Sequence, residues 1–221
     1  MRHLISQATH VLHDKIRNTP VEYSPKLSKL LGQPVYLKLE CLQVTGSFKV
    51  RGGFFYLSTL DAAERKRGVA ACSAGNHGLG VAYAGKQLGV PCTVFVPKSV
   101  DQAKYDKLVE LGAHVKKSEF SGYDDTLAWA TEEAKKLNIP LISAFNDEKI
   151  MAANGGTLAV EVLIQVPDAV HFVLPMGGGG LSAGFAWHIK EKNPHARIII
   201  CQLEGCPALQ LVIPARKFLT V

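Results

Sequence analysis

Apolar residues recur three and four positions apart at the start of the chain, which is the spacing of one face of a helix. This pattern predicts an amphipathic helix that ends before Asn18-Thr19-Pro20. A second, short helix is expected from about Pro25 to Leu31, because Gly32 follows it. The apolar positions of the first helix are Leu4, Ile5, Ala8, Val11, Leu12 and Ile16.

From residue 35 onward the sequence repeats one unit, which consists of a short apolar strand, a turn rich in glycine, and a helix. This alternation is typical of βαβ units, in which helices cover both faces of a parallel sheet. No long linker divides the chain, so two domains would have to be interleaved. Strands are expected at 35–40, 69–72, 92–96, 113–117, 140–143, 171–175 and 197–201, and helices at about 48–60, 81–88, 101–111, 123–137, 156–165 and 180–192.

Composition and charge narrow the class of protein. The 221 residues suffice for one large or two modest domains, and 47% hydrophobic with 20% charged residues is ordinary for a globular protein. The formal charge of +6 suits small anionic ligands, but no basic stripe with aromatic residues indicates nucleic acid. No signal-peptide core opens the chain, and no apolar run approaches the ~20 residues of a membrane span. The cysteines form no CxxC pair, which favours a reduced, cytoplasmic location for Cys41, Cys72, Cys92, Cys201 and Cys206.

A lysine between glycines follows the strand at 35–40, in the segment Thr45-Gly46-Ser47-Phe48-Lys49-Val50-Arg51-Gly52-Gly53. Ser47 is a good N-cap for the helix expected from Phe48 to about Leu60. Lys49 would then lie in the first turn, where the helix dipole disfavours the ammonium form and lowers the pKa. Lys49 is therefore either an ordinary solvated cation or a nucleophile for a carbonyl group.

Four successive glycines, Gly177 to Gly180, lie between a buried strand and a helix. Main-chain N–H groups and the helix dipole converge at such a point, which favours a phosphate site over a merely tight turn. A dinucleotide fingerprint is the rival interpretation, because Gly178 to Ala183 fits GxGxxA and Glu204 follows about 20 residues later.

A third turn of the same kind is Ser73-Ala74-Gly75-Asn76-His77. Its exposed N–H groups could bind a carboxylate, and Asn76 offers both a donor and an acceptor. His77 is a contact at most. The sequence contains no P-loop, HExxH or GxSxG motif and no metal-ligand spacing. A nucleophilic lysine, a phosphate cradle and a carboxylate turn together are the equipment for pyridoxal phosphate.

At these residues the chain resembles the threonine/serine dehydratases and serine racemases, which are fold type II pyridoxal-phosphate enzymes. The similarity runs from about Thr19 to Pro207, and the motifs TGSFKVRGG, SAGNHGLG and GGGGLSAG carry it in the family's order. The resemblance implies an α/β fold of two lobes, each a mainly parallel twisted sheet flanked by helices. Residues 1–67 and 145–221 would form a large cofactor-binding domain, and residues 68–144 a small domain inserted between them.

The resemblance also assigns roles to residues. Lys49 would hold the cofactor as a Schiff base and later remove the α-proton of the substrate, while Phe48 would lie beside the cofactor ring. Asn76 would hydrogen-bond the cofactor's 3′-oxygen. The phosphate would be held by Gly177, Gly178, Gly179, Gly180 and Leu181, and the substrate carboxylate by Ser73, Gly75, Asn76 and His77. The implied activity is loss of water from L-threonine or L-serine, with a homodimer as the family's habit.

Four departures from the family pattern qualify these expectations. Ala74 stands where the racemases carry a serine, which favours dehydration over racemisation. Gln202 and Ala208 replace the acidic pair of the cation site of some relatives, so no metal is expected. The lysine motif and phosphate loop also differ from those of the cysteine synthases. Relatives continue for roughly a hundred residues more, so a non-catalytic binding or assembly partner stays open as an alternative to the lyase. A nicotinamide oxidoreductase is the third hypothesis, and it rests on the fingerprint at Gly178 to Ala183 and Glu204.

Overall fold

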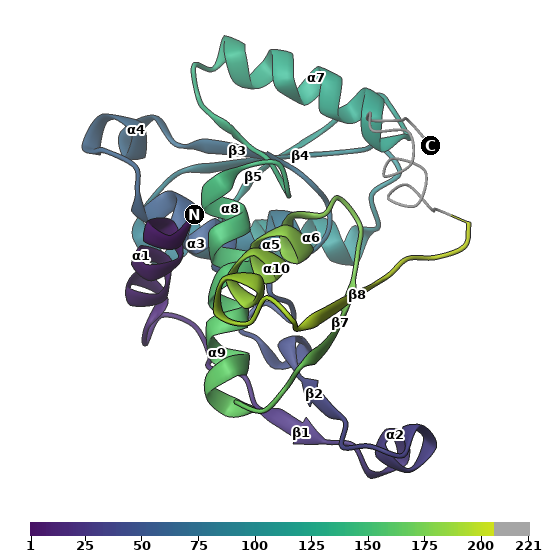
Figure 1. The fold of residues 1–221 in the computed structure, drawn as a ribbon. Helices are drawn as coiled ribbons and strands as arrows, with labels where there is room; N and C mark the ends of the chain where they lie inside the picture. Colours follow the sequence, from purple (N-terminus) through teal and green to yellow (C-terminus); the bar gives the residue numbers. More distant parts are fainter. Residues whose placement is uncertain (206–221) are drawn as a thin grey trace.

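The computed structural model describes residues 1–205 as three sheets with helices packed around them (Figure 1). Strands β1 and β2 form a short antiparallel pair, the central sheet is parallel throughout in the order β5-β4-β3-β6, and β7 pairs with β8 in parallel. The strands are β1 (Val21–Tyr23), β2 (Tyr36–Lys38), β3 (Val69–Cys72), β4 (Cys92–Val96), β5 (His114–Lys117), β6 (Leu141–Ile142), β7 (His171–Pro175) and β8 (Arg197–Cys201).

The helices follow the expected alternation with the strands. A 3-10 turn at Glu40–Leu42 follows β2, and a π-helical turn at Ala152–Gly156 joins two of the α-helices. Within residues 1–205, no helix has the length and apolar character that crossing a membrane requires. The α-helices are α1 (Arg2–Leu12), α2 (Pro25–Leu31), α3 (Lys49–Ser58), α4 (Ala62–Arg67), α5 (Asn76–Leu88), α6 (Gln102–Glu110), α7 (Tyr123–Lys136), α8 (Glu148–Met151), α9 (Thr157–Gln165) and α10 (Gly180–Lys192).

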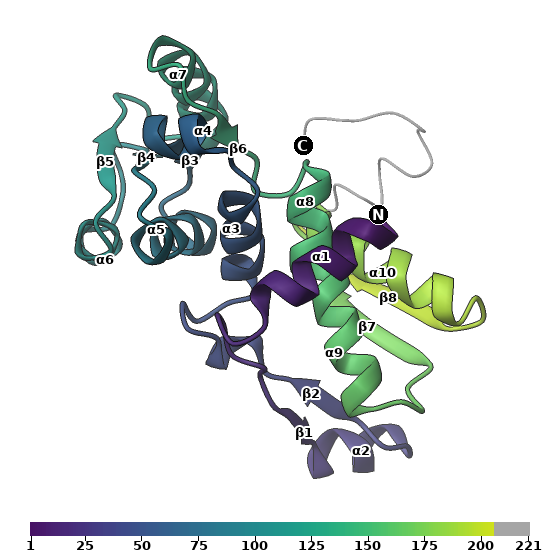
Figure 2. The ribbon, with the colours of Figure 1, turned by 90° about the vertical axis from the view of Figure 1, so that its left-hand side faces the viewer.

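Helices cover both faces of the central sheet, as the sequence predicts. Successive residues of a strand point to opposite faces. Val94 and Val96 of β4 accordingly pack with α5 and α6, whereas Phe95 packs with α7 on the other face. Figure 2 shows this layering, with α7 on one side of the sheet and α5 and α6 on the other. Around β7 and β8 the described helices α9 and α10 pack on one face only, and Val173 and Ile199 on the outer face are 64% and 46% exposed.

The largest apolar core joins elements that the sequence assigns to different domains. Phe55 and Leu57 of α3 pack in one cluster with Val69 of β3 and Val81 of α5. The central sheet comes entirely from residues 69–142, within the expected small domain. The division into two domains therefore stays a prediction, and the part at 206–221, which includes Pro207 and Ala208, lies outside the described residues.

The first helix is shorter than expected, because it ends at Leu12, before Ile16, and strand β1 was not foreseen. The helix expected from about Gly156 to Gln165 is α9, but helical structure begins earlier, at Glu148, where Asp147 caps α8 by accepting a hydrogen bond from the Ile150 amide at 2.9 Å. The π-helical turn then carries the helix through its two glycines into α9.

Candidate active site

Lys49 is the first residue of α3, and its side chain is half-buried. The Nζ atom donates a hydrogen bond to the main-chain oxygen of Ala144 at 2.8 Å and lies 5.4 Å from the centre of the Phe48 ring. Burial lowers the pKa of the Lys49 amine, because an ammonium loses hydration there. Burial thus shifts this pKa in the same direction that the helix dipole was expected to shift it.

The start of α3 is capped from another part of the chain. Phe48, not Ser47, is the N-cap residue, and the Ser47 hydroxyl only approaches the Lys49 amide at 3.4 Å. The Phe48 carbonyl accepts from the Arg51 amide, which leaves the Gly52 amide free to donate to Oδ1 of Asn154 at 2.8 Å. Asn154 is fully buried in the π-helical turn. This residue therefore supplies the cap that the adjacent sequence does not.

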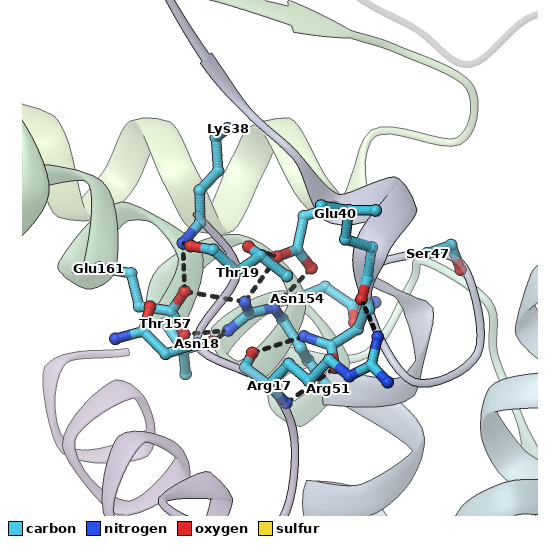
Figure 3. Close-up of polar contacts among 12 residues, drawn as sticks. Arg17, Asn18, Thr19, Lys38, Glu40, Ser47, Arg51, Asn154, Thr157 and Glu161 are labelled. Atoms are coloured by element: carbon cyan, nitrogen blue, oxygen red, sulfur yellow. Dashed lines mark hydrogen bonds and ion pairs between the residues drawn. The ribbon is translucent and has the colours of Figure 1, made fainter. Parts of the chain in front are cut away.

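A buried ion network fixes α3 two residues beyond the lysine (Figure 3). The guanidinium of Arg51 is 0% exposed and makes two hydrogen bonds to Glu40, at 2.8 and 2.7 Å, and two to Glu161, at 2.6 and 2.9 Å. Lys38 donates to Glu161 at 2.6 Å, so two cations face two carboxylates. Burial alone would lower the pKa of Arg51, but the hydrogen bonds that it donates to Glu40 and Glu161 raise it above its usual value.

A cavity of about 200 Å³ lies beside Lys49. Phe48, Lys49 and Phe145 line it together with residues 175–182, which include the whole glycine run. The structure thus brings the expected nucleophile and the expected phosphate cradle to one space, although 128 residues separate Lys49 from Gly177.

The glycine run has the geometry of an anion cradle. Gly179 is the N-cap of α10 and has φ of +88°, a conformation that side chains disfavour. A Cβ at Gly178 would fall 2.3 Å from the Phe145 ring, and one at Gly180 would fall 2.8 Å from Phe145 Cα. A Cβ at Gly177 would meet nothing within 4 Å, so space for a ligand is open there. The free N–H groups and the dipole of a 13-residue helix favour a phosphate at this point.

The third predicted turn leads from β3 into α5. The Ser73 hydroxyl accepts from the Gly75 amide at 3.1 Å, and Asn76 is the first residue of α5. The His77 ring turns away from any ligand, since it is 4% exposed and its Nε2 lies 3.0 Å from the Ile142 carbonyl. Burial, with a smaller contribution from the nearby charge of Lys49, lowers the pKa of His77 to about 4. Only the main-chain amide of His77 remains for a ligand, so its substrate role stays a prediction.

Sequence reasoning did not find three of the residues that shape the site. The Ala144 carbonyl and the Phe145 ring carry no sequence signal, because their effect depends on contacts distant in sequence. Asn154 could have been noticed as a polar residue among small apolar ones in Ala152-Ala153-Asn154-Gly155. Within residues 1–205, no group of His, Cys, Asp or Glu side chains is placed to hold a metal ion.

The arrangement is that of an enzyme with a lysine-bound cofactor, and comparison with known proteins agrees. The chain belongs to the family of pyridoxal-phosphate dependent enzymes, whose family model matches residues 12–219. The L-threonine ammonia-lyase of Thermotoga maritima is 38% identical over 205 residues, which cover 93% of this chain and 51% of that protein. The catabolic L-threonine dehydratase TdcB of Escherichia coli is 36% identical over 201 residues, covering 91% of this chain and 60% of that one.

Solved structures give the same fold. Maize serine racemase superposes with a TM-score of 0.94 at 28% identity, over 99% of this chain and 66% of that chain. The processed form of threonine deaminase isoform 2 from Solanum lycopersicum has a TM-score of 0.92 at 31% identity, over 98% and 59%. The expected family resemblance and the fold type II class are confirmed, and the dinucleotide interpretation is superseded. The chain spans about half the length of the first curated relatives it matches.

The residues present fit the family's cofactor. An amine of lowered pKa and a glycine cradle that would clash with added side chains line one cavity. These are the groups that the aldehyde and the phosphate of pyridoxal phosphate require.

Proposed function

We propose that the protein is a pyridoxal-phosphate-dependent ammonia-lyase that removes water from L-threonine or L-serine to yield a 2-oxo acid and ammonia. The observation that carries the proposal is the cavity that Lys49 shares with the glycine run at 177–180. Relatives named L-threonine ammonia-lyase and threonine deaminase support this reaction.

Lys49 is the proposed nucleophile and base. Attack on an aldehyde needs the neutral amine, and burial increases the neutral fraction because it lowers the pKa. The Ala144 carbonyl orients the amine by accepting its hydrogen bond. Phe48 would lie beside the cofactor ring, while the amides of residues 177–181 would hold the phosphate. When bound, pyridoxal phosphate supplies a conjugated electron sink that makes the α-carbon of the substrate acidic.

The turn from Ser73 to His77 would bind the substrate carboxylate. The first-turn amides of α5 and the positive end of its dipole favour an anion, and Asn76 would donate to the cofactor's 3′-oxygen. His77 would contribute its amide alone, because its ring is held by the Ile142 carbonyl. Lys49 would take the α-proton of the substrate and return a proton to the β-hydroxyl, which then leaves as water. The released enamine reacts with water to give the 2-oxo acid and ammonia.

Ala74 supports elimination over racemisation. A racemase exchanges protons on both faces of the α-carbon, so a second group must carry a proton opposite the lysine. A methyl side chain at position 74 has none to give. Serine racemase activity is therefore the second candidate, and the similarity to the maize enzyme favours testing it.

The test is a visible spectrum of the purified protein with pyridoxal phosphate, before and after addition of L-serine or L-threonine, combined with detection of the 2-oxo acid. We expect a band between about 400 and 430 nm, which borohydride fixes to residue 49, and release of ammonia. Lys49→Ala should abolish both, whereas Lys66→Ala, at an exposed lysine of α4, should change neither.

Three outcomes would contradict the proposal in different ways. A protein that binds the cofactor at Lys49 but releases no ammonia would be a binding or assembly partner rather than a lyase. A colourless protein in saturating cofactor would overturn the role of Lys49 itself. Formation of D-serine from L-serine would favour the racemase.

We further propose a cytoplasmic homodimer with an inserted domain at 68–144. Cys41, Cys72, Cys92 and Cys201 are free thiols, which suits a reducing compartment. Light scattering of the purified chain checks the dimer, and a monomer at micromolar concentration would contradict it.

A further inference from the structure

Ser182, the serine of the GGGGLSAG motif, adds to the cavity a polar group to which the sequence assigned no role. It lies in the first turn of α10, two residues after Gly180, and it lines the same cavity as Lys49 and the glycine run. The residue is only 7% exposed. Its hydroxyl is fully buried and has no hydrogen-bond partner among the residues that the structure describes.

A buried hydroxyl without a partner is unfavourable, because it has lost its hydrogen bonds to water. The buried hydroxyl of Thr157 avoids this cost, because it donates to the Ala153 carbonyl at 2.6 Å, four residues earlier. Ser182 makes no such bond, so its hydroxyl is available to a ligand in the cavity.

The position of Ser182 indicates the chemical class of that ligand. The cradle at 177–180 and the first turn of α10 offer N–H donors and the positive end of a helix dipole. The other polar side chain lining this part of the cavity is Lys49, whose amine is engaged with the Ala144 carbonyl. A ligand group that accepts hydrogen bonds and carries negative charge fits this surface, which is the description of a phosphate.

We propose that the Ser182 hydroxyl donates a hydrogen bond to the phosphate of the cofactor and so completes the cradle formed by the main chain of residues 177–181. The proposal rests on the cofactor of the proposed function, but not on the reaction. Ser182 is then a binding residue that sets cofactor affinity, and it explains why a buried polar side chain is retained in the first turn of α10.

The test compares two probes that differ only in the phosphate. The affinities of the protein for pyridoxal phosphate and for pyridoxal, which has the aldehyde but no phosphate, are measured by absorbance titration of the wild type and Ser182→Ala. We expect Ser182→Ala to weaken binding of pyridoxal phosphate by about tenfold, the value of one hydrogen bond to a charged acceptor. Its affinity for pyridoxal should stay within about twofold of the wild type, and Ser182→Thr, which keeps a hydroxyl, should recover part of the loss.

Thermal unfolding without cofactor separates this role from a structural one. Removal of an unpaired buried hydroxyl should leave the melting temperature of the apo-protein unchanged or raise it. Ser58→Ala is the matched control, because the Ser58 hydroxyl is already bonded to the Phe54 carbonyl at the far end of α3. That variant should leave the ratio of the two affinities unchanged.

Three results would overturn the inference. One is an equal loss of affinity for both probes, another is undiminished affinity for pyridoxal phosphate, and the third is a lowered melting temperature of apo Ser182→Ala. Failure of the proposed reaction would give a different result. The wild type would then release no ammonia, but Ser182→Ala would still bind pyridoxal phosphate more weakly and pyridoxal equally well.

Discussion

Arg51 and Glu161 are joined by two hydrogen bonds of 2.6 and 2.9 Å, although 110 positions separate them in the sequence. Arg51 follows Lys49 by two residues on α3, and Glu161 lies in the middle of α9. The pair therefore fastens the start of α3 to a helix that packs against α10.

Removal of the Glu161 charge should destabilise the fold. Glu161→Gln leaves Arg51 and Lys38 in a buried site with Glu40 as the remaining carboxylate. Breaking a buried pair in this way costs about 3–5 kcal/mol of unfolding free energy. Urea unfolding measures the loss. Glu132→Gln, which breaks the exposed pair with Lys135, is the control and should change stability little, and equal effects of the two variants would contradict the role of the network.

Two glycines of the cradle should respond differently to alanine. Gly178→Ala drives a Cβ into the Phe145 ring, so we expect a loss of about 1–3 kcal/mol in apo stability together with weaker cofactor binding. Gly177→Ala meets open space and should leave apo stability unchanged, while its methyl group occupies the place proposed for the phosphate. Thermal unfolding and cofactor titration check both. Normal cofactor affinity in both variants would count against the cradle.

Asn154→Ala should loosen the start of α3. The Gly52 amide loses its buried acceptor, which costs about 1–3 kcal/mol. Hydrogen exchange should show faster exchange of the Gly52 amide, and urea unfolding should show the lower stability. Asn146→Ala, at an exposed position, is the control. Unchanged protection of Gly52 in Asn154→Ala would show that the cap comes from elsewhere.

His77 should make stability depend on pH between about 4 and 6.5. In the unfolded chain its pKa is the usual 6.5, whereas burial lowers it to about 4 in the folded protein. The unfolded state therefore binds more protons in this window, so this contribution to stability is fully present above pH 6.5 and is lost as the pH falls. The loss amounts to about 3 kcal/mol.

His77→Asn isolates this effect, because it retains an N–H donor for Ile142 but does not titrate. Urea unfolding of both proteins from pH 7 to 4.5 measures the effect. We expect the unfolding free energy of the wild type to fall, relative to that of His77→Asn, as the pH is lowered. Parallel pH profiles of the two proteins would refute the assignment.

Local patterns predicted most of the elements and all three glycine turns. Gly32 and Gly89, for example, end α2 and α5 with positive φ, as a glycine at a helix C-terminus indicates. The helix expected from about Gly156 is α9, but the sequence did not show that helical structure reaches it through Gly155 and Gly156. A glycine is needed at 155 because a Cβ there would fall 2.1 Å from the Leu181 carbonyl of α10.

The parts of the site that the sequence did not reveal depend on partners distant along the chain. Ser47 is a good cap by its neighbours alone, but the acceptor for the Gly52 amide comes from Asn154. The sequence likewise gave Arg51 of the lysine motif no role of its own, because nothing near it in sequence identifies Glu161 as its partner. The orphaned hydroxyl of Ser182 is visible only once its surroundings are known.

The π-helical turn at Ala152–Gly156 contacts both ends of the site and so sets the distance between them. Through Asn154 it holds the lysine helix, and through Gly155 its backbone rests against the first turn of α10. One five-residue segment therefore sets the span from the amine to the anion cradle. If this turn were an ordinary α-helical turn, the distance between the Lys49 amine and the glycine run would change. The site would then no longer match the distance between the aldehyde and the phosphate of the proposed cofactor.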